Sequence, residues 1–375
     1  MPSLLQDTIH TAPFFFLFHG NHQPGFDSFY FSGEVVPEPI PGETYGIIVR
    51  YPAHETDAAN RLKLFRPELC TYIKANTLHC FTSLPETDAS QTAAPIVLKP
   101  ALSKAAYIEK VEALKKHIHL GDIYEVNFCM EFSSEQVELN PLELYKTLNS
   151  MSEAPFSALV KLGSTYMICS SPERFLKKEG AHLFSQPIKG TAKRGRNETE
   201  DKTLQEQLRN SLKEQTENVM IVDVVRNDLS KLATKGSVKV DELFGIYSYK
   251  QVHQMVSTVS CTLKTGTSFT DIMQATFPMA SMTGAPKQRA CDLIRQYEVS
   301  DRDLYSGALG FMNANGDFDL NVVIRTIIYN SETKRVSFHV GSAITAMCDA
   351  TEEYDECMLK AAAMVKALGA SFTQL

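Results

Sequence analysis

Hydrophobic and polar positions change their period along the chain, and the change divides it near residue 100. Before that point, short apolar runs such as residues 14–18 lie between turns rich in glycine and proline, a pattern typical of strands. After it, stretches with apolar residues three and four positions apart are separated by strand-like runs. We therefore expect a short β-rich N-terminal region at residues 1–100, packed on a larger domain at residues 101–375, with a linker near residues 90–95.

The larger domain mixes helical and strand-like patterns. Ser103 precedes the first helical pattern and is a suitable N-cap. We expect helices at residues 103–118, 141–149, 198–232 and 351–368, and another that begins near Pro286. Strands are expected at residues 123–132, 157–162, 165–169, 181–184, 307–312, 320–329 and 336–340, and around Lys239 and His253. Because no strand–helix–strand rhythm recurs, these elements predict an α+β fold.

Composition and charge narrow the classes of partner. The 375 residues carry a formal net charge of −7 at pH 7, with 43% hydrophobic and 22% charged residues. This balance is typical of a globular protein, and the acidic excess argues against nucleic acid as the main partner. An anionic substrate must therefore be held by a local cluster of cations and not by a global field.

Cysteines and apolar runs indicate the compartment. The eight cysteines include no C-x-x-C pair and lie mostly among apolar or small residues, which favours reduced, buried thiols over disulfides or a zinc site. The apolar run at residues 14–18 is too short to span a membrane and lacks the flanks of a signal peptide. We expect a cytoplasmic protein with no membrane segment.

Two of the predicted helices carry acidic residues on the stripe that otherwise holds apolar ones. Glu214 and Glu217 lie on this stripe in the first helix, and Glu353 and Glu356 in the second. A buried, unpaired carboxylate costs several kcal/mol, so such groups need a partner. Carboxylates from two helices suit Mg²⁺ bound together with an anionic substrate. The alternative is a solvated helix face, and the residues alone leave both interpretations open.

A lysine occupies a constrained position in residues 185–195. Pro187 fixes one backbone angle before Lys189, and Gly190 lets the main chain approach a ligand closely. If Lys189 is desolvated, its ammonium loses a proton more readily and the amine becomes a nucleophile. The alternative is an ordinary basic loop, because Lys193 and Arg194 follow at once.

Other candidates are individually weaker. Glu173 follows a predicted strand and could donate a proton, or could be an ordinary turn carboxylate. Arg325 lies inside an apolar run, where an arginine needs an anion or an acidic partner. Residues 341–344 could offer backbone N–H groups to a carboxylate, or form a simple turn. His253 in an apolar strand is more often a satisfied core histidine than a catalyst.

Eight short motifs together resemble the chorismate-utilising enzymes. In the order typical of that family, they lie at residues 121–127, 170–175, 187–191, 213–217, 220–229, 283–287, 324–326 and 353–356. The resemblance covers the chain from about residue 100 to its end. It implies a four-layer α/β/β/α structure in which two packed antiparallel sheets are covered by helices.

The resemblance also implies a reaction. The residue before Gly-Thr is typically alanine in anthranilate synthases and lysine in aminodeoxychorismate synthases, and here it is Lys189. By resemblance, Lys189 attacks C2 of chorismate while Glu173 protonates the departing C4 hydroxyl, and ammonia then enters at C4. This implies component I of an aminodeoxychorismate synthase. The alternatives are component I of an anthranilate synthase and a subunit that only binds a metabolite.

The remaining implied roles concern binding. Mg²⁺ would be held by Glu217 and Glu356, with Glu214 and Glu353 close by. Substrate carboxylates would be bound by Tyr305, Arg325, the backbone of Gly341, Ser342 and Ala343, and Lys360. Thr191 and His253 would line the pocket as further catalytic residues.

Two further features bear on the reaction. Water-adding members carry a lysine where this chain has Glu125, which disfavours isochorismate or salicylate synthesis, and aminating members usually carry glutamine there. The resemblance therefore assigns Glu125 no role. No glutamine amidotransferase signature is present in the sequence. We expect nitrogen to come from free ammonia or from a separate glutamine amidotransferase subunit.

Overall fold

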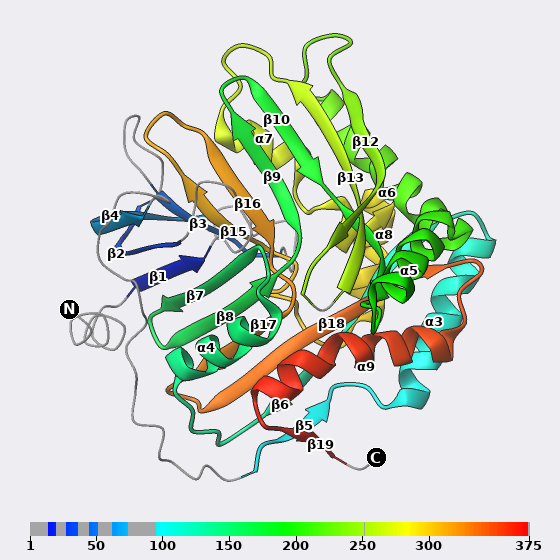
Figure 1. Cartoon of the computed structure of the whole chain (residues 1–375), viewed down its shortest axis with the longest axis horizontal. Helices are drawn as coiled ribbons and strands as arrows, with labels where there is room; N and C mark the ends of the chain where they lie inside the picture. Colours follow the sequence, from blue (N-terminus) through cyan, green and yellow to red (C-terminus); the bar gives the residue numbers. More distant parts are fainter. Residues whose placement is uncertain are drawn as a thin grey trace.

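The computed structural model describes residues 14–19, 28–36, 45–51, 62–73, 95–250 and 252–373. Its strands form two antiparallel sheets joined by the N-terminal strands (Figure 1). The predicted α+β class is confirmed. Among the described residues, no helix is long and apolar enough to cross a membrane.

The first sheet carries the lysine-bearing strand at one of its ends. In order of pairing it contains β3 (Tyr45–Val49), β15 (Ala308–Met312), β16 (Phe318–Val322), β9 (Arg174–Glu179), β10 (His182–Gln186) and β13 (Val252–Thr262), with β11 (Ile188–Lys193) and β12 (Lys239–Ser248) both paired to β13. Every pairing in this set is antiparallel.

The second sheet runs from the N-terminal strand to the strand that carries Glu125. It contains β1 (Phe14–His19), β7 (Phe156–Leu162), β8 (Thr165–Ser171), β17 (Thr326–Asn330), β18 (Arg335–Thr345), β6 (Glu125–Ser134) and β5 (Val97–Pro100). The short β14 (Gly284–Ala285) also pairs with β6, and β19 (Ser371–Phe372) pairs parallel with β5. Strands β2 (Ser28–Val36) and β4 (Leu62–Ile73) connect the two sheets through β1 and β3.

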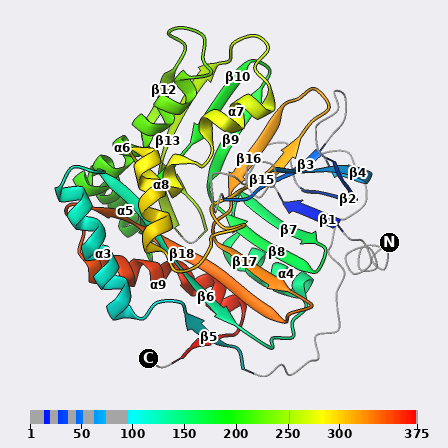
Figure 2. The ribbon, with the colours of Figure 1, turned by 180° about the vertical axis from the view of Figure 1, so that it is seen from behind.

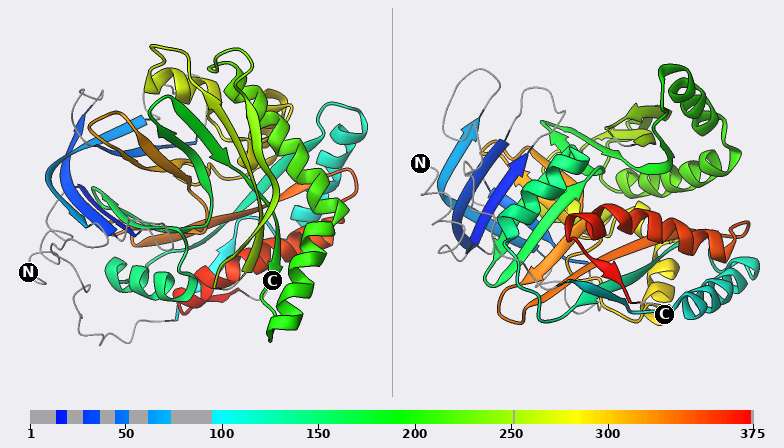
Figure 3. Two further views of the ribbon diagram at one scale, coloured as in Figure 1. Left: turned by 45° about the horizontal axis from the view of Figure 1, so that its top comes forward. Right: turned by 60° about the horizontal axis from the view of Figure 1, so that its bottom comes forward.

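Helices cover the sheets on two sides. The second sheet is contacted by α3 (Lys104–His119), α4 (Pro141–Ser152), α8 (Lys287–Tyr297) and α9 (Ala350–Ala367), and the first by α5 (Glu198–Asn210) and α6 (Leu212–Ser230). The helix α7 (Phe269–Thr276) and the 3-10 turn η2 (Ala280–Met282) pack on α6. The same grouping is visible from behind (Figure 2). The N-terminal strands lie at one end of the molecule, and α5 and α6 at the other (Figure 3).

Alternation along β6 decides which side chains reach the site. Val126 and Phe128 point into a hydrophobic core shared with α3 and α9. Because successive strand residues face opposite sides, Glu125 and Asn127 point away from that core. Both are nonetheless buried, and Cys129 on the same side packs in the core formed with α6. The apolar face of β6 thus places an acidic residue between the two sheets.

Several predicted elements are confirmed. Helix α9 ends within a residue of the predicted bounds at both ends, and Asp349 caps its first turn. Ser103 caps α3, since its side chain accepts a hydrogen bond from the Ala106 N–H. The six cysteines whose side chains are described are buried and unpaired, as expected.

Three predicted elements are wrong in their bounds. The helix expected at residues 198–232 is two helices, because Ser211 has an extended backbone and its hydroxyl caps α6 through the Glu214 N–H. The strand expected at residues 320–329 breaks into β16 and β17, with Arg325 between them at φ +51°. The strand expected to end at residue 340 continues to Thr345, so residues 341–344 form no turn.

The domain boundary near residue 100 stays a prediction. Residues 90–94 of the expected linker lie outside the described residues. On the N-terminal side, β1 hydrogen-bonds to β7 and β3 to β15. The N-terminal strands are therefore hydrogen-bonded into both sheets.

Candidate active site

Lys189 is buried and forms an ion pair with Glu125. The Lys189 Nζ donates to Glu125 Oε1 at 2.5 Å, and the two side chains are 9% and 1% exposed. Gly190, at φ +93°, follows on β11, and a Cβ there would lie 3.1 Å from Glu214 Oε2. Glycine therefore allows β11 to pass close to α6. The basic-loop alternative does not hold for Lys189, although Lys193 is exposed.

The charge state of Lys189 differs from the expectation of a lysine that deprotonates readily. Burial lowers the pKa of Lys189, but the negative charges of Glu125, Glu217 and Glu356 outweigh it and raise the pKa well above its usual value. Desolvation alone would favour the neutral amine of Lys189. The carboxylate in contact with Nζ reverses that result and stabilises the ammonium form of Lys189.

Glu173 has the properties of a proton donor. It lies in the turn between β8 and β9 with 5% exposure, and its carbonyl accepts a hydrogen bond from the Val322 N–H. Burial raises the pKa of Glu173 to about 7, against a hydrogen bond from Ser281 and the charge of Lys189. A carboxylic acid with a pKa near neutrality can hold its proton and give it to a leaving group.

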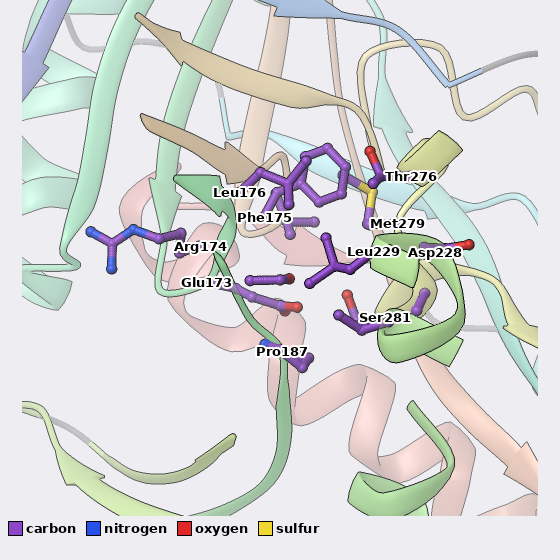
Figure 4. A pocket seen from close by; sticks show the side chains of 14 residues that line it. Glu173, Arg174, Phe175, Leu176, Pro187, Asp228, Leu229, Thr276, Met279 and Ser281 are labelled. Carbon is purple, nitrogen blue, oxygen red and sulfur yellow. The ribbon is translucent and has the colours of Figure 1, made fainter. Parts of the chain in front are cut away.

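A pocket opens beside Glu173 (Figure 4). Glu173 and Ser281 point toward each other in it, Asp228 lies beyond Ser281, and Thr276, Ser185 and Arg174 are its other polar lining residues. The rest of the lining is mostly apolar: Phe175, Leu176, Val225, Leu229, Met279, Ala280 and Val322. Apolar surroundings of this kind remove water from the Glu173 carboxyl, and this desolvation raises its pKa.

The four predicted metal-binding glutamates lie on buried or half-buried helix faces. Glu217 and Glu353 are buried, and Glu214 and Glu356 are half-buried. The solvated-face alternative therefore does not hold for Glu217 and Glu353, whereas the Glu356 side chain is 42% exposed. Burial raises the pKa of Glu217 to about 7 and also raises the pKa values of Glu214 and Glu353.

Lysines balance part of this negative charge. Lys213 lies 3.3 Å from Glu353, and Lys360 lies 2.6 Å from Glu356. Burial raises the pKa of Glu356, but Lys360 outweighs it and holds the pKa below its usual value. Oε1 of Glu217 is buried and has no hydrogen-bond partner.

The donor set fits Mg²⁺ in its chemistry. Carboxylate oxygens are the ligands this ion prefers, and an unpartnered buried oxygen is one that a cation would stabilise. No group of three or more His, Cys, Asp or Glu side chains in the described residues is already arranged to hold a metal ion. The metal site therefore stays a prediction supported by the types and burial of its residues.

The residues predicted to bind carboxylates meet along β18. After Phe338, the only described strand that pairs with β18 is β6. The opposite edge of β18 therefore has backbone groups at residues 341–343 that are not used in a strand pairing. Lys360 Nζ donates to the Gly341 carbonyl at 2.8 Å, and Arg325 Nη1 donates to the Lys360 carbonyl at 3.2 Å. Two cations and a free strand edge thus lie together.

The other residues of this set are more enclosed. The Ser342 hydroxyl is hydrogen-bonded to Tyr107 at 2.9 Å. Tyr305 is buried, and its ring stacks on His339 at 5.1 Å. A Cβ at Gly341 would lie 2.4 Å from Cys129 Sγ, so the backbone there admits only glycine.

Thr191 and His253 have different surroundings from Lys189. Thr191 is exposed and pairs with Gln254 across the β11–β13 ladder. His253 is fully buried, and its ring nitrogens are hydrogen-bonded to Ser248 at 2.8 Å and to Asp201 at 2.9 Å. Both nitrogens are engaged, which matches the core-histidine alternative, and we assign His253 no catalytic step.

Sequence reasoning missed the residues that support Glu173 and β6. The Asn127 amide donates to the Ser281 carbonyl at 3.1 Å, which fixes the turn whose hydroxyl meets Glu173. The buried Arg302 donates to the Asn127 carbonyl at 2.8 Å and pairs with Glu298 at 2.6 Å. The sequence offered one signal for this pair: Arg302 and Glu298 are four residues apart, a spacing at which opposite charges often form an ion pair.

The site places a buried lysine and buried carboxylates between two antiparallel sheets. An anthranilate synthase component I from Streptococcus pneumoniae has the same fold, with a TM-score of 0.74 at 23% identity over 90% of this chain and 83% of that chain. The chain belongs to the family of chorismate binding enzymes, whose sequence pattern matches residues 49–366. The family predicted from the sequence is thus confirmed.

Two curated relatives are named for the same activity. The aminodeoxychorismate synthase of Arabidopsis thaliana is 40% identical over 289 residues, which is 76% of this chain and 31% of that protein. The aminodeoxychorismate synthase component 1 of Bacillus subtilis is 36% identical over 284 residues, 76% of this chain and 58% of that protein. The chain therefore spans from about a third to somewhat over half of the length of these relatives.

Proposed function

We propose that this chain is component I of an aminodeoxychorismate synthase, which converts chorismate and ammonia to 4-amino-4-deoxychorismate. The observation that carries the proposal is the buried Lys189, held beside a second buried acid, Glu173, whose pKa is raised to about 7. A fixed lysine and a protonated carboxyl are the nucleophile and acid that replacement of a ring hydroxyl by nitrogen requires. The names of the two relatives support the same activity.

In the proposed reaction, the neutral amine of Lys189 attacks C2 of chorismate and the ring double bonds shift. The C4 oxygen leaves as water with the proton of Glu173. Ammonia then attacks C4, the C2–Nζ bond breaks, and its electron pair returns to Lys189. Arg325, Lys360 and the free edge of β18 would bind the substrate carboxylates and hold C2 near Nζ.

Glu217 and Glu356 would hold Mg²⁺, with Glu214 and Glu353 close by. When bound, the ion neutralises a substrate carboxylate and withdraws electron density from the ring. The chain's own contribution is to bring these carboxylates together on the buried faces of α6 and α9. A glutamine amidotransferase subunit would supply the ammonia, in keeping with the words "component 1" in the name of the Bacillus subtilis relative.

The product decides the proposal. The purified chain is incubated with chorismate, Mg²⁺ and an ammonium salt, and the products are separated by chromatography. We expect 4-amino-4-deoxychorismate as the main product. Anthranilate as the main product would replace the proposal with an anthranilate synthase, and unconsumed chorismate would indicate a subunit that only binds a metabolite.

A further inference from the structure

Glu125 and Lys189 join β6 to β11 in one buried ion pair. Glu125 Oε1 accepts the hydrogen bond from Nζ at 2.5 Å. The second oxygen, Oε2, is buried and has no hydrogen-bond partner. A buried carboxylate with this single partner depends on Lys189 for the stabilisation of its negative charge. The resemblance to known enzymes gave Glu125 no role, although among the described residues it is the one that forms an ion pair with the lysine nitrogen.

The ion pair creates a chemical requirement. A lysine attacks an electrophile only as the neutral amine, whereas the surrounding carboxylates stabilise the ammonium form of Lys189. In this chain Nζ contacts a carboxylate, whereas members with glutamine at this position have none there, so the proposed reaction here needs a group that removes a proton from Nζ before the C2–Nζ bond forms.

The charged groups that face Lys189 come from four elements. They are Glu125 on β6, Glu214 and Glu217 on α6, Glu356 on α9, and Glu173 in the turn before β9. In the described part of the chain, only Glu125 is in hydrogen-bond contact with Nζ. Glu173 must keep its own proton for the leaving group, and the carboxylates of α6 and α9 are proposed to face a cation. Glu125 is the acceptor that remains.

We propose that Glu125 is a catalytic base that takes the proton from Lys189, an inference that rests on the proposed function. An Nζ–H bond breaks, an Oε1–H bond forms, and the lone pair left on Nζ attacks C2. Water leaves C4 with the proton of Glu173, which later recovers a proton from solvent. When ammonia expels Lys189 from C2, the proton returns from Glu125 to Nζ and the ion pair re-forms.

Two features of the ion pair suit this transfer, although the neighbouring carboxylates stabilise the ammonium form of Lys189. Moving the proton converts two buried charges into two neutral groups, and Glu125 has no second hydrogen bond that would hold its charge in place. The transfer also needs no movement, because donor and acceptor are already in contact. A carboxylate that only anchored the lysine would be expected to use both of its oxygens.

The test measures formation of the chorismate adduct on Lys189 without ammonia, by rapid quenching and intact-protein mass spectrometry. Glu125→Gln keeps the size of the side chain and removes the base. We expect the adduct to form about 10²-fold more slowly near neutral pH. The rate should then rise with pH as solvent hydroxide takes over the removal of the proton. The matched control is Glu131→Gln on the same strand, which removes an ion pair with Arg335 outside the site and should leave the rate unchanged.

Chemical rescue separates a base from a structural ion pair. Glu125→Ala leaves room for formate. Added formate should raise the rate of adduct formation in this variant about tenfold, because it supplies a carboxylate. Loss of rate without rescue would overturn the inference, as would a Glu125→Gln rate and pH profile equal to those of the unmodified protein. If Glu125→Gln unfolds at a lower temperature, Glu125→Asp retains the carboxylate and should keep more activity than Glu125→Gln.

The same assay distinguishes this inference from the proposed function. If the unmodified protein forms no adduct with chorismate, the proposed function fails. If the adduct forms and depends on Lys189 but not on Glu125, the proposed function stands and the role of Glu125 is wrong.

Discussion

Two sets of ionisable residues form the site, and they are built in different ways. The sheet group consists of Lys189, Glu125 and Glu173, on strands or in the turn between them. The helix group consists of Glu214, Glu217, Glu353 and Glu356, on α6 and α9. In the sheet group, Lys189 and Glu125 balance each other and Glu173 has a raised pKa of about 7. In the helix group, carboxylates outnumber the lysines that contact them, and Glu217 Oε1 has no hydrogen-bond partner.

The difference indicates a division of labour. Hydrogen-bonded strands hold their side chains in place without help, so the sheet group can keep its nucleophile and acid in position before substrate arrives. Carboxylates on two separate helices repel one another, so the helix group depends on added positive charge. Substitutions in the sheet group should therefore change the rate of bond making, whereas those in the helix group should change the affinity for a cation.

The largest effect is expected from Lys189→Ala. Without the nucleophile no adduct can form at C2, and amination of chorismate should fall by more than about 10³-fold. The adduct peak should disappear from the intact-mass spectrum, while chorismate still binds in a calorimetric titration. Lys193→Ala, an exposed lysine on the same strand, is the control and should keep full activity. Retention of rate in Lys189→Ala would show that the sheet group carries no covalent step.

Glu173→Gln tests the acid of the sheet group. We expect the rate to fall by about 10²-fold to 10³-fold, because the C4 oxygen must then leave without a proton from the protein. In the unmodified protein, kcat/KM should decline above about pH 7, where the Glu173 carboxyl loses its proton. If kcat/KM of Glu173→Gln declines above the same pH, the decline is caused by another ionisable group.

The same carboxyl affects stability with a defined sign. Its pKa rises on folding from 4.5 to about 7, so the folded state binds the proton more tightly than the unfolded state. The free energy of unfolding contributed by Glu173 therefore falls as pH rises through this range, and the penalty is complete above it. Glu173→Gln should remove this part of the pH dependence in denaturant titrations.

Glu217→Gln tests the helix group. We expect about a 10²-fold loss of Mg²⁺ affinity, measured by calorimetry in the presence of chorismate. In Mg²⁺-free buffer the same change should raise the melting temperature by roughly 2 °C, because it removes a buried charge with an unpartnered oxygen. Glu352→Gln, an exposed residue on α9, should change neither quantity. Equal Mg²⁺ affinities in the two variants would contradict the division of labour.

Sequence patterns predicted the helix group better than the sheet group. The helical period alone placed α9, and it put Glu353 on the buried side of that helix, with Glu356 half-buried one turn further on. The break at Ser211 was missed although Ser211 and Glu214 have the spacing of a capping box, which is a sequence signal for a helix N-terminus. Likewise, the small residues after Val340 suggested a turn, whereas close packing on β6 keeps them in β18.

The contact at the centre of the sheet group could not be predicted. Glu125 and Lys189 are 64 residues apart and lie in different sheets. Alternation along β6 predicts that Glu125 faces away from the apolar core, but only the topology decides which strand it meets. The direction of the Lys189 pKa shift was missed for the same reason. The sequence suggested that burial would lower this pKa, but it did not reveal the partner carboxylate that raises it.

The smallest effect is expected where the two groups touch, at Gly190. An alanine there would be strained at φ +93°, and its Cβ would lie 3.1 Å from Glu214 Oε2 and Leu208 Cδ1. Gly180 offers a matched control, since it also has a positive φ, of +59°, but a Cβ there would contact nothing within 4 Å. Each alanine should lower the free energy of unfolding by about 1–2 kcal/mol through backbone strain.

Only Gly190→Ala should also shift α6, by a few tenths of an ångström at Glu214. We expect about a threefold to tenfold loss of Mg²⁺ affinity in calorimetry, with the rate of adduct formation at saturating Mg²⁺ less affected. If both variants lose only stability, the approach of β11 to α6 does not couple the groups. A larger loss of adduct rate than of Mg²⁺ affinity would show that Gly190 serves mainly to orient Lys189 in the sheet group.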